Sequence, residues 1–463
     1  MPKLLMSPPS LPPSDPAAEA RMRPEHWSAL ARDLAARGED EEALRSYDRA
    51  LALKPDVAQW LNDRGNVLRN LGRFAEAEAS LRRALQLTPN SAGAHFDLGN
   101  ILYSVGRTAD SQASYRAAMR LRPDMSRVHF RLGMALLKAG QFEEGWKEFE
   151  RRWQVRDALP PFCNPTWNGE PSGDRDLLLF AHQTEGYGDT IQFCRYVPEL
   201  AKRARRIILW VRPSLVRLLA RLPGVSEVVA LGGPPPACDL QCAIMRLPYI
   251  ARTTLETIPA ATPYLAAEPA DVAHWRKRLA GTTNLRVGLC WSGELRHTPT
   301  YRAWDRRRSL TLETLAPLAE VSGVRFFSLQ KGAPAAEAAR PPPGMDLSDF
   351  TADLNDFADT AALIESLDLV ISVDTSVAHL AGALNKPVWL LTPYDACWRW
   401  LLDRDDSPWY PSLRQFRKTT PWDWHSAVGR VHEALQRVAA GDRSQLRPAS
   451  PALSGTSLAR SSD

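Results

Sequence analysis

The sequence predicts an α-solenoid followed by an α/β region with two Rossmann-like halves. Two observations support this prediction. Between about residues 24 and 157, glycine, proline and alanine recur at a step of 34 residues, which indicates stacked pairs of helices. From Arg175 onward, short runs of Val, Ile and Leu alternate with helical patterns, as expected for parallel strands joined by helices. A segment rich in Pro and Ala, residues 260–269, is the expected hinge between the halves.

The composition narrows the class of protein. The chain has 463 residues, enough for two or three domains. It contains no apolar run of about 18 residues, so we expect no transmembrane segment. The net charge of +5 (58 Lys and Arg minus 53 Asp and Glu) permits an anionic substrate but does not favour nucleic acid as a partner.

The cysteines and the N-terminal residues indicate the cellular compartment of the protein. The six cysteines are scattered without a C-x-x-C pair, so neither a zinc site nor a disulfide framework is indicated. The first residues, MPKLLMSPPSLPPSDP, contain an apolar segment interrupted by proline, which differs from a signal peptide. We therefore expect a cytoplasmic protein in a reducing compartment. Residues 1–23 are expected to be disordered.

Two sets of small residues carry the 34-residue step. One set is expected in the turn between paired helices, where a positive φ favours glycine. The other is expected where two helices approach closely, and prolines at the same step end each unit. The turn set is Gly38, Gly72, Gly106 and Gly140; the contact set is Ala31, Gly65, Gly99 and Gly133; the prolines are Pro55, Pro89 and Pro123. This pattern resembles the tetratricopeptide repeat.

About four repeats over residues 24–157 would form a short right-handed solenoid. The concave face of such an array commonly binds an extended peptide, so a protein or peptide partner is expected there. The alternative is that the array forms an oligomer or docks on the rest of its own chain. In the fourth unit the pattern weakens, and Trp146 and Trp153 are expected to pack against the α/β region. A linker with Pro160, Pro161 and Pro165 comes after the fourth unit.

The two α/β halves are predicted over residues 158–270 and 271–440. In the first half, strands are expected at 176–181, 206–211, 227–231 and 238–243, with a loop at 182–189 and a helix at 190–203. In the second half, strands are expected at 285–291, 324–329, 367–373 and 388–391, and helices at 271–280, 309–321, 357–367 and 377–384. Residues 441–463 are rich in Ser, Pro and Ala and are expected to be a disordered tail.

The stretch LDLVISVDTSVAHLAGALNKPVWLLT, residues 367–392, is the centre of the second half. It predicts a buried strand, a tight turn, a helix and another buried strand. Asp374, Thr375 and Ser376 end the first strand and supply side chains typical of a helix N-cap. The free N–H groups of the helix would point at the carboxyl edge of the sheet, which is a favourable place for phosphate.

Part of this stretch resembles the D-T/S-x-x-x-H-L-A signature of heptosyltransferase-like glycosyltransferases. The matching residues are Asp374, Thr375, His379, Leu380 and Ala381. The resemblance implies a GT-B architecture, with the cleft between the halves and the nucleotide-sugar donor in the second half. The alternative is structural: Asp374 caps the helix, and His379 is a helix histidine with satisfied hydrogen bonds.

The loop HQTEGYGD is the candidate acceptor site. Gly186 and Gly188 would allow close approach of a ligand. In the glycosyltransferases that this chain resembles, a G-x-G-D loop presents a carboxylate to the acceptor hydroxyl, and the matching residue here is Asp189. A carboxylate can accept the proton of an attacking hydroxyl, which makes Asp189 the candidate general base. The alternative is that Asp189 caps the helix expected after the loop.

Several residues are candidates for binding the donor. The resemblance places nucleotide or diphosphate near Trp291, Ser292 and Gly293, which come after a predicted strand; an ordinary turn is the alternative. Arg308, in the run RRRSL that is expected to open a helix, and Lys331, at the end of a strand, could stabilise the departing diphosphate. No D-x-D pair follows a strand, so we expect no metal, and no cofactor is expected beyond the nucleotide-sugar substrate.

The sequence between residues 398 and 424 contains a dense cluster of aromatic residues. It could stack on a base or a sugar, or pack in the core; its members are Trp398, Trp400, Trp409, Tyr410, Trp422 and Trp424. Together with the order of repeats and transferase-like region, the resemblance implies an inverting bacterial glycosyltransferase that modifies a protein recruited by the repeats. The alternatives are a heptosyltransferase-like enzyme that modifies a saccharide, and a scaffold whose transferase-like region is inactive. An oligomer is possible in each case.

Overall fold

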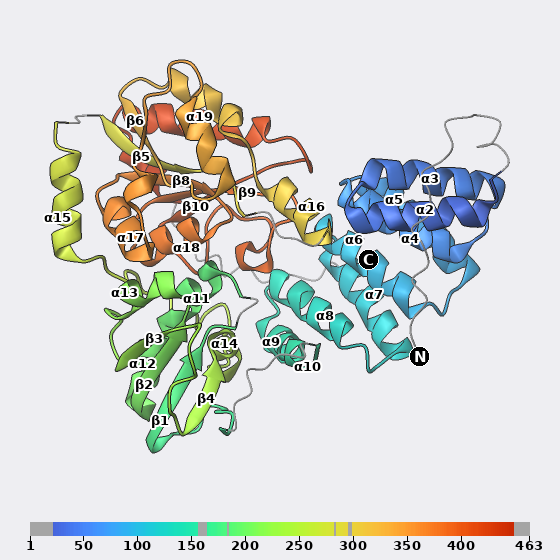
Figure 1. The fold of residues 1–463 in the computed structure, drawn as a ribbon, viewed down its shortest axis with the longest axis horizontal. Coiled ribbons are helices and arrows are strands. Elements are labelled where there is room, and N and C mark those ends of the chain that lie inside the picture. The colour runs from blue at the N-terminus through green and yellow to red at the C-terminus, as the bar shows by residue number, and fades with distance from the viewer. Residues whose placement is uncertain (1–21, 156–163, 183–184, 282–283, 295–298, 449–463) are drawn as a thin grey trace, which may run out of the picture.

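A computed structural model describes residues 22–155, 164–182, 185–281, 284–294 and 299–448. Disorder was predicted for residues 1–23, of which residues 1–21 lie outside these ranges. Cys163, the linker residues Pro160 and Pro161, and residues 449–463 of the tail also lie outside them. Figure 1 shows a helical array beside an α/β region that contains two sheets. The predicted fold class, an α-solenoid followed by parallel-sheet α/β, is confirmed.

The repeats are four antiparallel pairs of helices, with a short helix after the last pair. The glycines predicted for the turns all adopt a positive φ, which is 80° at Gly38, 74° at Gly72, 78° at Gly106 and 78° at Gly140. These values explain why glycine recurs in each turn. The helices are α2 (Pro24–Arg37), α3 (Asp40–Leu53), α4 (Ala58–Asn70), α5 (Phe74–Leu87), α6 (Ala92–Ser104), α7 (Thr108–Leu121), α8 (Ser126–Lys138), α9 (Phe142–Glu150) and α10 (Arg152–Val155).

The second set of small residues lies where paired helices touch. A Cβ atom added to Gly99 would lie 2.6 Å from the ring of Tyr115, and one added to Gly133 would lie 2.5 Å from the backbone nitrogen of Phe149. These distances are shorter than any ordinary contact between non-bonded atoms, so a Cβ at either position would overlap the paired helix in a close-packed interior. Glycine therefore sets the spacing between the helices of these repeats.

The first α/β half contains a four-stranded parallel sheet in the order β3-β2-β1-β4. Its strands are β1 (Gly173–Phe180), β2 (Ala204–Val211), β3 (Glu227–Ala230) and β4 (Leu240–Ala243). Where a helix was predicted over 190–203, the chain forms α11 (Tyr187–Phe193), α12 (Val197–Leu200) and short 3-10 turns between and after them. Helix α11 begins three residues earlier than predicted, so Asp189 lies in its first turn rather than before it. The short helices α13 (Val216–Leu219) and α14 (Leu247–Ile250) complete this half.

The second half contains a six-stranded parallel sheet in the order β10-β9-β8-β5-β6-β7. The predicted strands appear as β5 (Leu285–Cys290), β6 (Val324–Ser328), β8 (Leu369–Val373) and β9 (Val388–Thr392); β7 (Leu347–Asp349) and β10 (Leu413–Arg417) were not among the predicted strands. The helices are α15 (Pro269–Arg278), α16 (Pro299–Arg308), α17 (Phe357–Glu365), α18 (Ser376–Ala383) and α19 (His425–Ala439).

Two predictions about this half differ from the structure. Arg308 was expected to open a helix over 309–321, but it is the last residue of α16, and the 3-10 helix η5 (Leu312–Glu320) comes after it. Helix α16, with the sequence PTYRAWDRRR, has little apolar character, and its neighbours include repeat helices α2 and α4. Within the predicted tail, residues Arg443–Leu446 form a 3-10 turn, and the indole of Trp389 donates to the carbonyl of Gln445 at 3.2 Å.

The repeats dock on the α/β region through their turns. The ring of Trp422 lies against Gly72, and its indole nitrogen donates to the carbonyl of Leu71 at 2.8 Å. Further along, Gly106 faces Leu402 and Gly140 faces Leu255. The alternative in which the array docks on its own chain is therefore realised along this edge.

The fourth repeat also joins the two halves. Trp146 of α9 packs edge-on against Trp398 of the second half at 5.2 Å and against Phe193 of the first half at 6.5 Å. Its indole nitrogen donates to the carbonyl of Thr253 at 2.9 Å. One continuous buried cluster contains side chains from this repeat and from both halves. The prediction that Trp146 packs against the α/β region is confirmed.

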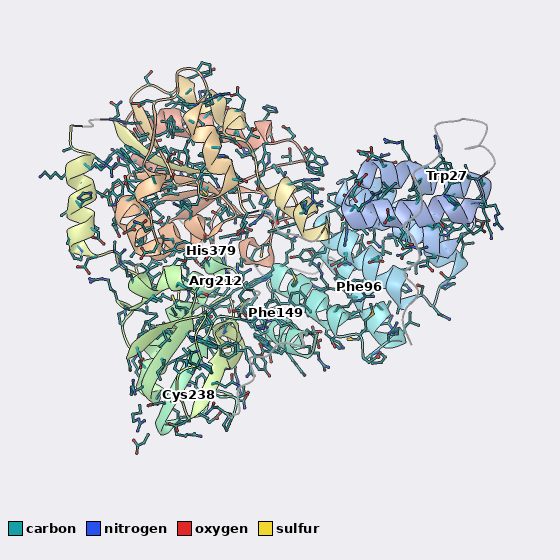
Figure 2. The ribbon with its side chains drawn as sticks, in the orientation of Figure 1. Trp27, Phe96, Phe149, Arg212, Cys238 and His379 are labelled. Carbon is teal, nitrogen blue, oxygen red and sulfur yellow. The ribbon has the colours of Figure 1, made fainter. Side chains whose placement is uncertain are left out.

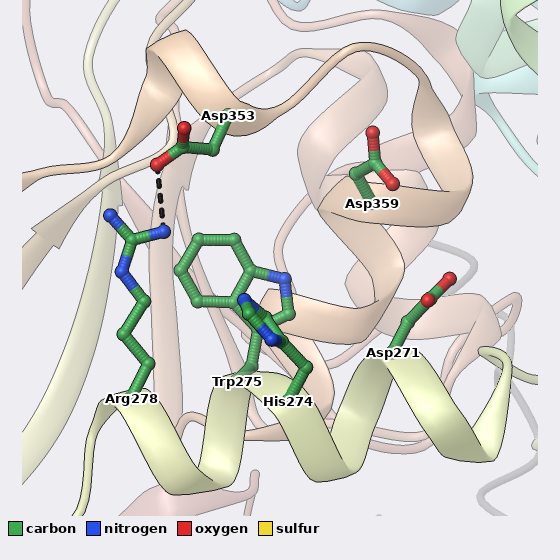
Figure 3. A pocket seen from close by; sticks show the side chains of 6 residues that line it. All are labelled: Asp271, His274, Trp275, Arg278, Asp353 and Asp359. Atoms are coloured by element: carbon green, nitrogen blue, oxygen red, sulfur yellow. Dashed lines mark ion pairs between the residues drawn. The ribbon is translucent and has the colours of Figure 1, made fainter.

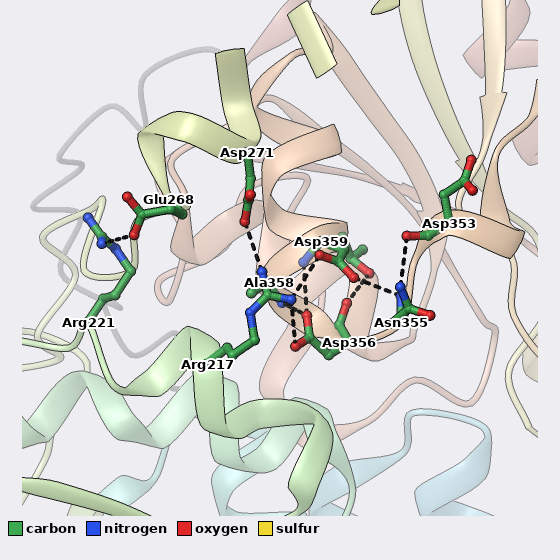
Figure 4. A network of polar contacts seen from close by, with 10 residues as sticks. Arg217, Arg221, Glu268, Asp271, Asp353, Asn355, Asp356, Ala358 and Asp359 are labelled. Atoms are coloured by element: carbon green, nitrogen blue, oxygen red, sulfur yellow. Dashed lines mark hydrogen bonds and ion pairs between the residues drawn. The ribbon is translucent and has the colours of Figure 1, made fainter. Parts of the chain in front are cut away.

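An ionic network connects the halves on their outer side (Figure 4). Arg217 of α13 pairs with Asp271 of α15 at 2.9 Å, and with Asp356 and Asp359 of the α17 region at 3.0 Å each. Arg221 pairs with Glu268 nearby. The side chain of Arg217 is 51% exposed, so solvent screens these attractions and each contributes little to stability.

Candidate functional site

The second sheet reverses its strand order between β5 and β8, which are neighbours at its centre. In open parallel sheets, ligands bind beyond the carboxyl ends of the strands at such a reversal. The turn Trp291–Gly293 comes after β5, and Asp374 and Thr375 come after β8, so the fold brings these two predicted segments together. The first sheet reverses between β1 and β4, and the loop that contains Gly186 comes after β1.

Arg308 joins the two segments of the second half. Its Nη1 donates to the backbone carbonyl of Asp374 at 2.7 Å, and its Nε donates to the carboxylate of Asp305 at 3.0 Å. A Cβ atom on Gly293 would lie 2.5 Å from Nη2 of Arg308, so the guanidinium lies directly on this glycine. Burial raises the pKa of the Asp374 carboxyl above its ordinary value, and the charge of Arg308 opposes the rise.

The other predicted donor residues make contacts within the protein. The Gly293 N–H donates to Oγ of Ser309 at 3.1 Å, and the Ser292 hydroxyl donates to the Gly293 carbonyl at 3.1 Å. The Lys331 ammonium donates to the carbonyls of Thr351 at 2.7 Å and Leu354 at 3.0 Å. The roles of these residues in donor binding stay predictions.

Gln330 is a site residue that was not predicted from the sequence. Its Oε1 accepts from the N–H groups of Trp291 at 3.0 Å and Ser292 at 2.8 Å, and its Nε2 donates to the Ser292 carbonyl at 3.0 Å. The side chain therefore fixes the turn after β5. A polar residue directly after a buried strand, in the sequence SLQKG, was the signal available for it.

His379 lies in α18 where the two halves meet (Figure 2). Its Nδ1 is 2.9 Å from the Tyr410 hydroxyl, and its ring stacks on Trp400 with centroids 5.3 Å apart. Burial lowers the pKa of His379 well below its ordinary value, because removal from water disfavours the charged imidazolium. Thr375 is the N-cap of α18, and its hydroxyl lies 3.0 Å from that of Ser372.

The acceptor loop predicted in the first half touches the donor segment of the second. A Cβ atom on Gly188 would lie 2.7 Å from Cδ2 of His379, so α11 and α18 are in direct contact at this glycine. Asp189 is the third residue of α11, and its Oδ2 accepts from the Gly186 N–H at 2.8 Å. Asp189 is therefore not the N-cap that the sequence predicted: Gly186 holds that position, and Asp189 caps from inside the first turn by accepting from the N-cap N–H. Capping does not exclude a catalytic role for the same carboxylate.

Arg399 connects Asp189 to the second half. Its Nη2 donates to Oδ1 of Asp189 at 2.5 Å, and its Nε donates to Oε1 of Gln192 at 2.5 Å. The guanidinium also lies over the ring of Trp398, 4.4 Å from its centroid. Nothing in the local sequence indicated this role, because the partners of Arg399 are about two hundred residues away.

The aromatic cluster divides between two environments. Trp398, Trp400, Trp409 and Tyr410 are fully buried, which favours the core-packing alternative for them. Trp424 is also buried and belongs to the core of the second half. Trp422 is 52% exposed and contacts the repeats instead.

A separate pocket of about 230 Å³ lies on the outer side of the second half (Figure 3). It is lined by Asp271, His274, Trp275, Arg278, Asp353 and Asp359, and Arg278 pairs with Asp353 across it at 2.7 Å. None of the residues predicted for the donor or acceptor site lines this pocket. Among the described residues, no group of three or more His, Cys, Asp or Glu side chains is arranged to hold a metal ion.

The fold and these segments define a tetratricopeptide-repeat protein with a parallel-sheet α/β domain of two halves. Tetratricopeptide-repeat profiles match residues 27–59, 65–106 and 96–160. The profile of glycosyltransferase family 9 (heptosyltransferase) matches residues 315–392, which include Lys331 and the signature around His379. The chain thus contains tetratricopeptide repeats and, over residues 315–392, a segment that matches glycosyltransferase family 9.

Individual relatives cover parts of the chain. Protein FlbA of Caulobacter vibrioides is 29% identical over 336 residues, which are 64% of this chain and 53% of FlbA. The chain thus spans about half the length of this curated relative. A solved structure of MamA from Desulfovibrio magneticus RS-1 is 20% identical, with a TM-score of 0.29, over 31% of this chain and 82% of MamA. The first repeat domain of Spaghetti (RPAP3), bound to an HSP90 peptide, is 17% identical over 24% of this chain and 90% of that domain, with a TM-score of 0.24.

None of the helices in the described parts of the chain is both long and apolar enough to span a bilayer.

Proposed function

We propose that this protein is a GT-B glycosyltransferase that moves a sugar from a nucleotide-sugar donor to an acceptor hydroxyl, without a metal ion and with inversion. The observation that carries the proposal is the contact between α11 and α18. It puts the Asp189 carboxylate, at the switch point of one sheet, beside the segment Asp374–His379, at the switch point of the other.

In the proposed reaction, Asp189 accepts the proton of the acceptor hydroxyl. The hydroxyl oxygen forms a bond to the anomeric carbon while the bond from that carbon to the diphosphate oxygen breaks. The nucleoside diphosphate leaves with the electron pair, and a single displacement of this kind inverts the anomeric centre. The N-terminus of α18 and the guanidinium of Arg308 are the groups that would stabilise the charge on the leaving diphosphate. Trp291, Ser292, Gly293, Lys331, Asp374, Thr375 and Ser376 are proposed as the surrounding donor residues.

We assign the acceptor to a protein or peptide that the repeats recruit, in the cytoplasm. The support is the position of the array, whose turns dock on the α/β region so that bound peptide would be close to the halves. The first helices of the repeats carry polar side chains that could hold a peptide: Asn62 and Asn66 both donate to Oδ2 of Asp97, at 2.8 Å each.

The test is a thermal-shift titration with nucleoside diphosphates and nucleotide sugars, and then a transfer assay with the donor that binds. A ligand of the native state raises the melting temperature by mass action. Asp374→Asn should abolish the shift. Asp189→Asn should keep the shift but lower transfer about 10²- to 10⁴-fold, because it removes the general base. Asp353→Asn, in the outer pocket, is the matched control. If no donor shifts the folded chain, the proposal fails.

One observation favours a second candidate, a scaffold with an inactive transferase-like domain. Both oxygens of Asp189 already have donors, and the Gly293 N–H already has an acceptor. An inactive domain would transfer no sugar whether or not it binds a donor, so the transfer assay separates the candidates. If a donor binds and Asp189→Asn transfers sugar at the unaltered rate, Asp189 is not the base.

A further inference from the structure

Arg399 makes a contact across the boundary between the two α/β halves. It belongs to the segment 393–401, which comes after β9 of the second half, whereas Asp189 and Gln192 belong to α11 of the first. The guanidinium donates to one oxygen of each side chain at 2.5 Å. A planar fork of donors that engages two acceptors one helical turn apart fixes both the position and the rotation of α11.

The environment of Arg399 restricts its own movement. The residue is 8% exposed, and its guanidinium contacts the rings of both Trp398 and Phe193, at 4.4 and 5.6 Å from their centroids. Its Nη1 additionally lies 3.1 Å from the Cys397 sulfur. An arginine enclosed in this way loses less freedom when it binds a carboxylate than one on the surface, since packing already selects its rotamer.

The segment that carries Arg399 is held by the repeats. Tyr394 stacks on Phe74 of the second repeat with ring centroids 6.2 Å apart. Arg307 donates to Oδ2 of Asp395 at 2.9 and 3.0 Å and to the carbonyl of Asn70 at 2.9 Å. Since Trp398 also packs on Trp146 of the fourth repeat, the second and fourth repeats both support this segment.

We infer that Arg399 is a positioning residue, which holds Asp189 in place for proton transfer from the second half of the protein. The inference rests on the proposed function, in which Asp189 is the base. The Gly186 N–H fixes the second carboxylate oxygen from the first half. Each carboxylate oxygen can accept more than one hydrogen bond, so the carboxylate can still accept an acceptor hydroxyl. Proton transfer thus depends on both halves and, through the 393–401 segment, on the repeats.

The test compares Arg399→Ala and Arg399→Lys with the matched variant Arg404→Ala. Arg404 lies in the same part of the chain, but pairs with Asp406 and does not contact α11. Arg399→Ala should lower kcat about 100-fold, the effect of a misplacement near 1 Å, with the KM for the donor unchanged. Added guanidinium ion should restore part of kcat in Arg399→Ala only. Arg399→Lys should retain more activity, because it keeps the charge but loses the fork.

Two results would overturn the inference. One is a loss of kcat that merely follows a loss of melting temperature and does not respond to guanidinium. The other comes from hydrogen exchange, which requires no activity: amides of residues 187–193 should exchange faster in Arg399→Ala than in Arg404→Ala, and equal exchange contradicts the inference. If the unaltered chain transfers no sugar from any donor, the proposed function fails, and the exchange experiment alone decides whether Arg399 positions α11.

Discussion

Gly133→Ala tests the spacing between the helices of the fourth repeat. The added Cβ would lie 2.5 Å from the backbone nitrogen of Phe149 and 2.9 Å from its Cα. Both atoms belong to the backbone of α9, which cannot move aside as a flexible side chain can. Helices α8 and α9 must therefore separate, and Trp146 of α9 must move with them, away from Trp398.

The expected cost comes from two opposing contributions. Overpacking at a backbone contact costs about 3 kcal/mol, toward the upper end of the usual range. Replacing glycine by alanine inside a helix contributes about 1 kcal/mol in the other direction. The net loss of about 2 kcal/mol corresponds to a fall in melting temperature of roughly 5–10 °C if the repeat array unfolds as one unit.

Thermal unfolding measured by far-ultraviolet circular dichroism reports this change, with Gly429→Ala as the control. Gly429 is inside α19, and an added Cβ there would meet no atom within 4 Å. Only the helix preference remains at that position, so Gly429→Ala should stabilise the chain by up to about 1 kcal/mol. If Gly133→Ala also stabilises the chain, the helices of the fourth repeat are not in the close contact described, and the reasoning is wrong.

Three further variants test other contacts. Gly293→Ala should push the guanidinium of Arg308 away from the Asp374 carbonyl and weaken nucleoside diphosphate binding about tenfold in titration calorimetry, since a charged hydrogen bond is worth about 1.5 kcal/mol. Trp146→Ala should cost about 3–5 kcal/mol, measured as a lower melting temperature. Burial lowers the pKa of Lys138 from 10.5 to about 8, so the unfolded chain binds more protons than the folded one between these values. Stability from this group therefore rises with pH through that window. Lys138→Met lacks this contribution, and its melting temperature relative to the unaltered chain should fall as pH rises from about 8 to 10.

Each of these variants has an outcome that contradicts its premise. If Gly293→Ala binds nucleoside diphosphate with unchanged affinity, Arg308 does not contribute to donor binding. A melting temperature of Trp146→Ala equal to that of the unaltered chain would mean that the fourth repeat does not stabilise the junction. A constant difference between Lys138→Met and the unaltered chain across the pH window would mean that the buried ammonium has its ordinary pKa.

The repeats could be predicted from sequence because their contacts are local. Each unit meets chiefly its neighbours, so the requirement for a small residue or a positive φ returns every 34 residues. Gly72 and Gly106 adopt the expected conformation for this reason. The buried strands were also predictable, because β8 and β9 are short, largely apolar runs between polar turns.

Elements that depend on distant contacts were not predictable in the same way. Helix α16 lacks an apolar periodic face, and its place beside the repeats comes from Arg307, whose partners are Asp395 and the carbonyl of Asn70. The prediction that Arg308 opens a helix was wrong because the run of arginines ends one. Arg399 was overlooked since its function depends on two residues of α11, whose proximity only the fold reveals.

The candidate site could be predicted as a set of loops but not as a set of contacts. Strand-end positions identified Asp374, Gly293 and the Gly186 loop, and the order of the strands brings the first two together. Whether their polar groups face a ligand or each other depends on side chains such as Gln330, which occupies the N–H groups of the turn after β5.

The docking of successive turns has a consequence for how the chain can change in length. Gly72 meets Trp422, Gly106 meets Leu402 and Gly140 meets Leu255, so the second, third and fourth repeats each have a separate docking contact on the α/β region. In an open solenoid, a unit can be duplicated or lost in the middle with little effect, because only neighbours interact. Here, inserting or deleting a unit between the second and fourth repeats would move at least one of these turns away from the α/β residue that it contacts. The array should therefore resist the insertion or deletion of a unit between the second and fourth repeats.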